Sequence, residues 1–210
     1  MKSFVFQRAA SDWATETETL LHVYALIDLD RHRQLAGLLR GCREATQDFP
    51  LTFVEDRWLH ITLDQIPDKA AVDIPEPERE QLRAELARRL GDFPAFEVTI
   101  GSVLSYHSGL IADISPDDQL DALHEAVHGA IRDLRGEAAA AYPWSAQHLT
   151  LAYANGEADS DEVQRRLRRV RPSHAPLRID SVHIVDVAAD AFAKTITWTD
   201  LAEIPLGRAA

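Results

Sequence analysis

The chain has 210 residues and an apolar content of 46%, enough for one sizeable domain with a substantial buried core. Its 22 basic and 34 acidic side chains give a formal net charge of −12, which argues against a long nucleic acid as a partner, because polyanions bind mainly through Lys and Arg. A small nucleotide or an RNA terminus, with few phosphates, remains compatible with this charge. The single cysteine, Cys42, excludes an intramolecular disulfide and a multi-thiolate metal site.

The first residues contain no apolar segment long enough for a secretory signal, and no stretch approaches the ~18 apolar residues that span a bilayer. We therefore expect a cytoplasmic protein without a membrane partner, and we expect it to be a monomer. Residues 1–19 end in a polar run that cannot bury a face, and we interpret them as an N-terminal extension or an edge element. Residues 20–210 are expected to form one domain.

The first half of the chain alternates between strand and helix signals. We predict a strand over residues 20–29, a helix from Asp30 to Cys42, a strand around residues 59–63, a Pro-rich loop over residues 67–77, a helix over residues 78–90, and two strands over residues 96–106 and 110–114. Asp30 would suit the N-cap of the first helix.

The second half continues this alternation. A helix is predicted from Ser115, as its cap, to Gly136, and it carries one apolar stripe. A strand over residues 144–154, a helix over residues 160–170, and two strands over residues 177–187 and 192–201 follow.

Two strands carry the same short pattern of His, apolar residue, Thr, apolar residue. In the first, His60 and Thr62 share one face with Asp64, because side chains alternate along a strand. In the second, His148 and Thr150 share a face, and Tyr153 is expected on the opposite one. A single such pattern is expected roughly 0.1 times by chance in a chain with this composition, so two copies on alternating strands indicate an internal duplication.

This pattern suits chemistry on a phosphate. An imidazole and a hydroxyl two residues apart on a strand can reach one phosphate group, and two such strands would place an imidazole on each side of the phosphorus. In-line displacement needs this arrangement, with a base near the nucleophile and an acid near the leaving group. Histidine can hold either protonation state near neutral pH.

The sequence resembles the two-histidine (2H) phosphoesterases, which include the 2′-5′ RNA ligase-like proteins and the RNA 2′,3′-cyclic phosphodiesterases. The resemblance is carried by Trp58-Leu59-His60-Ile61-Thr62-Leu63 and by the segment from Tyr142 to Tyr153, which contains His148-Leu149-Thr150-Leu151. It extends over about residues 20–206, although outside the motifs only the order of elements is similar.

The resemblance implies a bilobal, duplicated α+β fold with two antiparallel sheets lining a central cleft and helices on the outside. It also implies hydrolysis of a 2′,3′-cyclic or 2′-5′ linked nucleotide without a metal or other cofactor. By the same likeness His148 is assigned as base and His60 as acid, while Thr62 and Thr150 hold phosphate oxygens. RNA-acting members often carry an aromatic-Leu-Gly run after the first motif and an Arg after the second, whereas this chain has Asp64-Gln65-Ile66 and Tyr153 there.

Aromatic residues near the motifs are candidates for substrate binding. Trp58 and Trp144 could offer a surface for stacking a base, Tyr24 shares a strand face with His22 that could border the cleft, and Tyr106 and Tyr153 are also candidates. The arginine-rich run over residues 165–171 could meet an RNA backbone, but on a helix it is more often a solvated face.

Two other functions remain open from the sequence. The segment His124-Glu125-Ala126-Val127-His128 has the zincin spacing, and a zinc metallohydrolase would need a third ligand such as Glu157 or Glu162. We favour the interpretation that these histidines flank a buried helix stripe. The chain could also be a non-catalytic module that binds a phosphorylated ligand in its cleft.

Overall fold

The computed structural model describes residues 1–5 and 19–207, so most of the predicted N-terminal extension lies outside the described residues. Along the described chain, α-helices separate groups of one to three strands. The elements are β1 (Leu20–Leu26), α1 (Arg33–Thr46), β2 (Leu51–Phe53), β3 (His60–Ile66), α2 (Glu76–Leu90), β4 (Phe96–Tyr106), β5 (Gly109–Ser115), α3 (Asp118–Arg135), β6 (His148–Ala154), α4 (Ser160–Leu167), β7 (Ala175–Ile179), β8 (Ser181–Asp190) and β9 (Thr195–Pro205).

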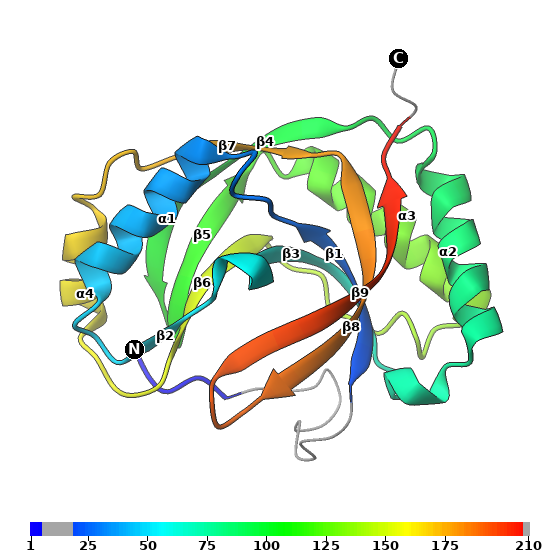
Figure 1. Cartoon of the computed structure of the whole chain (residues 1–210), viewed down its shortest axis with the longest axis horizontal. Helices are drawn as coiled ribbons and strands as arrows, with labels where there is room; N and C mark the ends of the chain where they lie inside the picture. The colour runs from blue at the N-terminus through cyan, green and yellow to red at the C-terminus, as the bar shows by residue number, and fades with distance from the viewer. Residues whose placement is uncertain (6–18, 208–210) are drawn as a thin grey trace.

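The strands form two antiparallel sheets. Sheet one has the order β3-β1-β8-β9 and sheet two has the order β2-β6-β5-β4-β7. Helices α2 and α3 pack against sheet one at one end of the molecule, and α1 and α4 pack against sheet two at the other end (Figure 1). The fold is therefore α+β and bilobal, with two antiparallel sheets between outer helices, as the sequence predicts.

Both sheets repeat one arrangement around their motif strand. β3 pairs with β1, the strand of the same sheet that precedes it along the chain, and β6 pairs with β5 in the same way. The helix between the paired strands does not cover their own sheet: α1 lies between β1 and β3 along the chain but contacts β7, and α3 lies between β5 and β6 but contacts β3. Each sheet is thus covered by one helix from the first half of the chain and one from the second.

The predicted strand over residues 177–187 is two strands in different sheets. β7 ends at Ile179 in sheet two, and β8 begins at Ser181 in sheet one. Asp180 stands between them, and its carboxylate pairs with Arg31 at 2.6 Å while its carbonyl accepts from the Leu206 amide. The sequence pattern did not separate the two strands, because apolar and polar residues alternate on both sides of Asp180.

Two predicted helix caps are wrong. α1 begins at Arg33 rather than at Asp30, because the Asp28 carboxylate accepts from the Asp30 and Arg31 amides and forms a separate turn there. Ser115 does not cap α3, since it is paired with Thr99 as the last residue of β5. The backbone of Ser115 therefore belongs to the sheet.

Smaller differences concern element ends. The predicted strand over residues 144–154 begins only at His148, and the predicted helix over residues 160–170 ends at Leu167. Strand β2 has no counterpart among the predicted elements, because three residues are too few for a period-two signal. Among the described helices, none combines the length and apolar composition needed to cross a membrane.

Candidate active site

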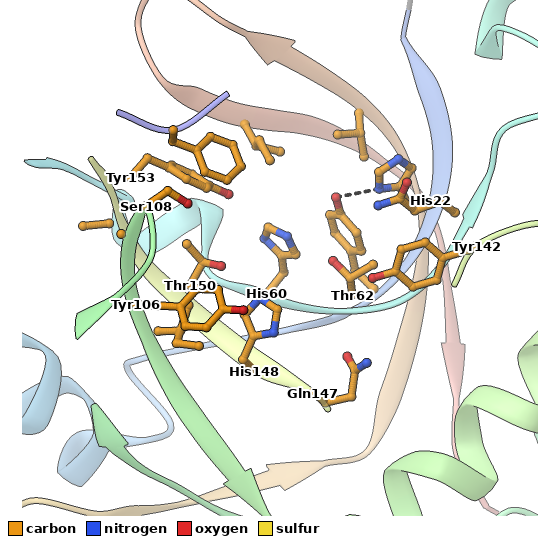
Figure 2. A pocket seen from close by; sticks show the side chains of 18 residues that line it. His22, His60, Thr62, Tyr106, Ser108, Tyr142, Gln147, His148, Thr150 and Tyr153 are labelled. Carbon is orange, nitrogen blue, oxygen red and sulfur yellow. Dashed lines mark hydrogen bonds between the residues drawn. The ribbon is translucent and has the colours of Figure 1, made fainter. Parts of the chain in front are cut away.

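A cavity of about 350 Å³ lies between the two sheets. Its walls are built from both motif strands, with His60 and Thr62 from β3 and His148 and Thr150 from β6 (Figure 2). The remaining lining residues are Phe4, His22, Tyr24, Gln65, Tyr106, Ser108, Gly109, Ile111, Tyr142, Gln147, Ala152, Tyr153, Val187 and Ile196. The structure thus brings together the two motifs that the sequence places 88 positions apart.

Both motif histidines are oriented by the same backbone contact. The Nδ1–H of His60 donates to the carbonyl oxygen of Trp58 at 2.9 Å, and that of His148 faces the carbonyl of Ala146 at 3.4 Å. In each case the acceptor belongs to the residue two positions earlier. Because a carbonyl oxygen can only accept, each ring carries its proton on Nδ1 and keeps Nε2 for a ligand.

A β-bulge interrupts each motif strand at the equivalent place. The register of β3 against β1 shifts between Thr62 and Asp64, and the register of β6 against β5 shifts between Thr150 and Ala152. An extra residue in one strand reverses the side-chain alternation beyond it. The bulges therefore place the fifth residue after each histidine, Gln65 in β3 and Tyr153 in β6, in the cavity.

The bulges correct two expectations from strict alternation. Tyr153 lines the cavity with His148 and Thr150, although the sequence pattern places it on the opposite face. Strict alternation also places Asp64 beside His60 and Thr62, but it is fully buried on the other side of β3. The burial pattern of β3 shows the reversal directly, because Leu63 and Asp64 are buried in succession.

At each bulge, one backbone carbonyl accepts a hydrogen bond from a residue outside the two paired strands. The Leu63 carbonyl accepts from Nδ1–H of His124 on α3 at 2.9 Å. The equivalent Leu151 carbonyl accepts from the backbone N–H of Val54, next to β2, also at 2.9 Å. β3 is an edge strand, so the donor to its bulge carbonyl is a side chain of helix α3. At the bulge of β6 the donor is a backbone N–H of the neighbouring segment.

This contact explains the zincin-like spacing on α3. His124 and His128 lie one turn apart on the helix face that meets β3, where His128 Nδ1 is 3.0 Å from the Asp64 carboxylate. Trp144 stacks on the His124 ring with centroids 3.8 Å apart. Both histidines thus fasten α3 to β3 at the bulge.

The same three side chains form the candidate metal site of the described residues. Ligand atoms of Asp64, His124 and His128 all lie within 4.8 Å of one another. The third candidate is therefore Asp64, and not the downstream Glu157 or Glu162 that the sequence suggests. Each group already has a protein partner, and none of the three lines the cavity, so a metal held there would not face the motif histidines.

Burial sets the protonation of the cavity walls. It lowers the pKa of His60 to about 4, helped by the nearby His148 ring and opposed by the bond to Trp58. It lowers the pKa of His22 to about 3 and raises that of Tyr142 to about 12. Before a ligand binds, His60 and His22 are therefore neutral at pH 7, and the Tyr142 hydroxyl keeps its proton.

The structure separates the predicted aromatic residues into two groups. Tyr24, Tyr106 and Tyr153 line the cavity, whereas Trp58 and Trp144 do not. Trp144 donates its indole N–H to Asp121 at 2.8 Å, on α3. Trp58 packs edge-on against Trp198 and borders a neighbouring cavity of about 210 Å³, so neither indole is a wall of the main cavity.

Several cavity residues escape sequence reasoning because they lie on other elements. Phe4 reaches the cavity from the N-terminal segment and packs on Tyr153, with ring centroids 4.6 Å apart. Tyr142 and Gln147 come from the irregular segment before β6, and Ser108 from the turn before β5. No periodicity marks such positions, although Tyr142 and Gln147 belong to a segment that carries the family resemblance.

The arginine-rich run does not contribute to the cavity. Arg165 pairs with Glu162 at 2.6 Å, Arg166 pairs with Asp48 at 3.2 Å, and Arg171 donates to backbone carbonyls. None of the five arginines of this run is among the described residues that line the cavity.

Comparison with known proteins places this architecture in a family. Residues 30–191 match the model of the 2′-5′ RNA ligase superfamily. Among solved structures, TT0787 of Thermus thermophilus has a TM-score of 0.67 and 18% identity, covering 89% of this chain and 97% of that one. Escherichia coli LigT complexed with phosphate has a TM-score of 0.58 and 13% identity, covering 91% of this chain and 100% of that one. A search of curated proteins finds no match. Because the family model covers most of the sequence, the chain belongs to the 2′-5′ RNA ligase superfamily, whose fold is that of a two-histidine phosphoesterase.

Proposed function

We propose that the protein is a metal-independent phosphodiesterase that hydrolyses 2′,3′-cyclic or 2′-5′ linked nucleotides by acid–base catalysis. One observation carries this proposal: His60 and His148 line one cavity, and each has its Nδ1 tied to a backbone carbonyl, so that Nε2 is left for the substrate. Thr62 and Thr150 stand beside them as hydroxyl donors to phosphate oxygens.

The reaction needs two proton transfers on opposite sides of the phosphorus. The base takes a proton from water as the water oxygen bonds to phosphorus, and the acid gives a proton to the sugar oxygen as its bond to phosphorus breaks. The product of a 2′,3′-cyclic substrate is then a phosphomonoester with a free hydroxyl group. The two histidines exchange protonation states and return to the start through solvent.

The burial of His60 favours this residue as the base. Its lowered pKa makes Nε2 an unprotonated acceptor at neutral pH, so His148 is left as the acid. The family resemblance implies the opposite assignment. We adopt His60 as the base, because burial of its ring lowers its pKa and so keeps Nε2 unprotonated at neutral pH.

The lining of the cavity supports a phosphodiester as substrate. Among the described residues that line it, histidines are the side chains able to carry positive charge. One imidazolium can balance the single charge of a diester, whereas a monoester with two charges is left partly unbalanced. LigT, which shares this fold, has been crystallised with phosphate and with 3′-AMP.

The size and charge of the protein favour a small ligand. The cavity volume of about 350 Å³ lies in the range of small-molecule sites, and Tyr106, Tyr153 and Phe4 offer aromatic surface for a base. We propose a small nucleotide or an RNA terminus rather than a long nucleic acid, given the net charge of −12.

A metal-free assay tests the function. Purified protein is incubated with 2′,3′-cyclic AMP in excess EDTA, and product is followed by chromatography. We expect turnover, and we expect His60→Ala and His148→Ala each to lose about 10²–10⁴-fold in rate. The matched control is His107→Ala, an exposed histidine outside the cavity lining, which should keep the full rate.

Three results would contradict the proposal. Turnover only with added zinc favours a metallohydrolase, and tight nucleotide binding without turnover across cyclic and 2′-5′ linked substrates favours a binding module. Full activity of either histidine variant removes the acid–base pair. We further propose a cytoplasmic monomer, and light scattering behind size exclusion should give a mass near 23.4 kDa.

A further inference from the structure

A separate cavity of about 230 Å³ lies where helices α1 and α4 meet strand β4 (Figure 1). Its polar lining residues are Ser102 from β4, Gln164 and Arg168 from α4 and its end, and Arg171 and Ser173 from the segment that leads to β7. The other lining residues are apolar side chains and Cys42. The described residues that line this cavity and those that line the cavity between the two sheets have no member in common, so the two sites are distinct.

The charged groups of this cavity have one sign. Arg168 and Arg171 line it, and the described residues that line it include no Asp or Glu. Burial raises the pKa of the Cys42 thiol to about 12, so this thiol is neutral at pH 7. A hollow that combines apolar walls with charges of one sign focuses their field. The cavity therefore attracts anions, although the whole chain has a net charge of −12.

The two arginines of the cavity differ from their neighbours in the arginine-rich run over residues 165–171. Arg165 and Arg166 each pair with a carboxylate, at 2.6 Å and 3.2 Å. Arg168 and Arg171 have no carboxylate within ion-pair distance among the described residues, and the hydrogen bonds of Arg171 go to backbone carbonyls. Their positive charges are thus not balanced by a neighbouring side chain.

Arg171 is held in place at the end of α4. Its Nη1 donates to the carbonyl oxygens of Arg168 at 2.9 Å and of Val170 at 2.6 Å. These bonds cover carbonyl groups that otherwise carry the negative end of the helix dipole toward the cavity. A guanidinium has five N–H donors, so Arg171 keeps further donors for a ligand.

A β-bulge brings two hydroxyl groups to the same side of the cavity. The register of β4 against β5 shifts around Gly101, whose φ is +125°. A Cβ atom there would lie 2.4 Å from the carbonyl oxygen of Ser173, so only glycine lets the segment after α4 approach β4 this closely. The His174 ring then lies between two hydroxyl oxygens, with Nδ1 2.9 Å from that of Ser173 and Nε2 3.5 Å from that of Ser102.

We propose that this cavity binds the phosphate group of a small phosphorylated molecule. Arg168 and Arg171 supply positive charge and N–H donors, and Ser102 and Ser173 supply hydroxyl donors. Guanidinium groups bind phosphate oxygens through charge-assisted hydrogen bonds, and hydroxyl groups add neutral ones. The volume of about 230 Å³ suits a phosphate with a small organic part. This site goes beyond the proposed function, because it uses neither motif histidine.

An NMR titration tests the site. ¹⁵N-labelled protein at physiological ionic strength is titrated with inorganic phosphate as the probe, and the backbone amide shifts of Ser102 and Ser173 are followed. We expect these shifts to saturate. We expect Arg168→Gln to weaken this binding about tenfold, because a charge-assisted hydrogen bond is lost. The matched control is Arg165→Gln, a substitution of another exposed arginine of α4 that lies outside the cavity, and it should leave the affinity unchanged.

Several results would overturn the proposal. Shifts at Ser102 and Ser173 that do not saturate, or equal effects of the two arginine substitutions, show that phosphate acts only by general screening of charge. A single-stranded RNA without a terminal phosphate that shifts these amides more strongly than inorganic phosphate identifies a nucleic-acid surface instead. Phosphate-dependent shifts at Thr62 and Thr150 arise in the cavity between the sheets and test the proposed function separately.

Discussion

The imidazole of His124 and the backbone carbonyl of Leu63 are hydrogen-bonded across 2.9 Å, from helix α3 to the bulge of edge strand β3. The bulge determines that Gln65 lines the cavity and that Asp64 does not. His124, which the sequence pattern marks as a possible zinc ligand, therefore stabilises the bulge that follows the first histidine motif in β3.

Loss of this contact should destabilise the fold. We expect His124→Leu to lower the free energy of unfolding by about 1–3 kcal/mol, because the buried Leu63 carbonyl is left without a partner. Urea denaturation at pH 7.5 measures the change. The control is Glu125→Gln, an exposed neighbour that a zincin mechanism would require as its general base. Loss of activity in Glu125→Gln, with stability unchanged, would restore the metallohydrolase interpretation.

Stability should fall toward acid pH because of buried neutral histidines. The pKa of His22 is lowered to about 3 in the folded protein, so below pH 6.5 the unfolded chain binds a proton that the folded chain does not. The free energy of unfolding therefore decreases as the pH falls from 6.5 toward 3. Between pH 7.5 and pH 5, His22 alone should contribute a loss of about 2 kcal/mol.

A comparison of wild type with His22→Asn isolates the contribution of His22 to this pH dependence. Urea titrations of wild type and of His22→Asn at pH 7.5 and pH 5 should show a smaller acid loss in the variant, which has no ionisable group at that position. His60, whose pKa is lowered to about 4, contributes in the same direction in both proteins. Equal losses in the two proteins would show that His22 is not a buried neutral group.

Gly109 should tolerate no side chain. A Cβ atom there would lie 2.2 Å from the carbonyl oxygen of Ala152, in the pairing of β5 with β6 beside the cavity. We expect Gly109→Ala to cost about 1–3 kcal/mol of stability and to lower activity by moving Thr150. The matched control, Gly37→Ala in α1, has open space around its Cβ and should gain about 0.5–1 kcal/mol. Thermal denaturation of both variants provides the measurement.

The leaving group should reveal which histidine is the acid. An aryl ester such as a nucleotide p-nitrophenyl phosphodiester leaves without protonation, so it does not need an acid. We expect His148→Ala to lose much less rate on the aryl ester than on the cyclic nucleotide, and His60→Ala to lose about equally on both. The reverse pattern would assign His60 as the acid, as the family resemblance implies.

Much of the site could be predicted from the sequence because the His-x-Thr pattern lies on short alternating strands. His60 with Thr62, and His148 with Thr150, need only the two-residue period to share a face. The pairing of the two strands across one cavity also followed from their repetition. These predictions needed only the alternation of side chains within one strand, which can be read from neighbouring residues in the sequence.

The remaining parts depended on register and on distant partners. The bulges that bring Gln65 and Tyr153 into the cavity are visible only once β3 and β6 are paired with their neighbours. The contact of His124 with Leu63 joins positions 61 residues apart, and the break at Asp180 depends on which sheet receives each strand. Alternation rules alone cannot give such relationships.

The covering of each sheet by one helix from each half of the chain ties the two lobes together. Sheet one, with His60, is covered by α2 and α3, and sheet two, with His148, is covered by α1 and α4. Sheet one also combines β1 and β3 with β8 and β9 from the other end of the chain, so the strand that carries His60 has its sheet partners and its covering helices from both halves. We therefore expect the two lobes to unfold together in one cooperative transition.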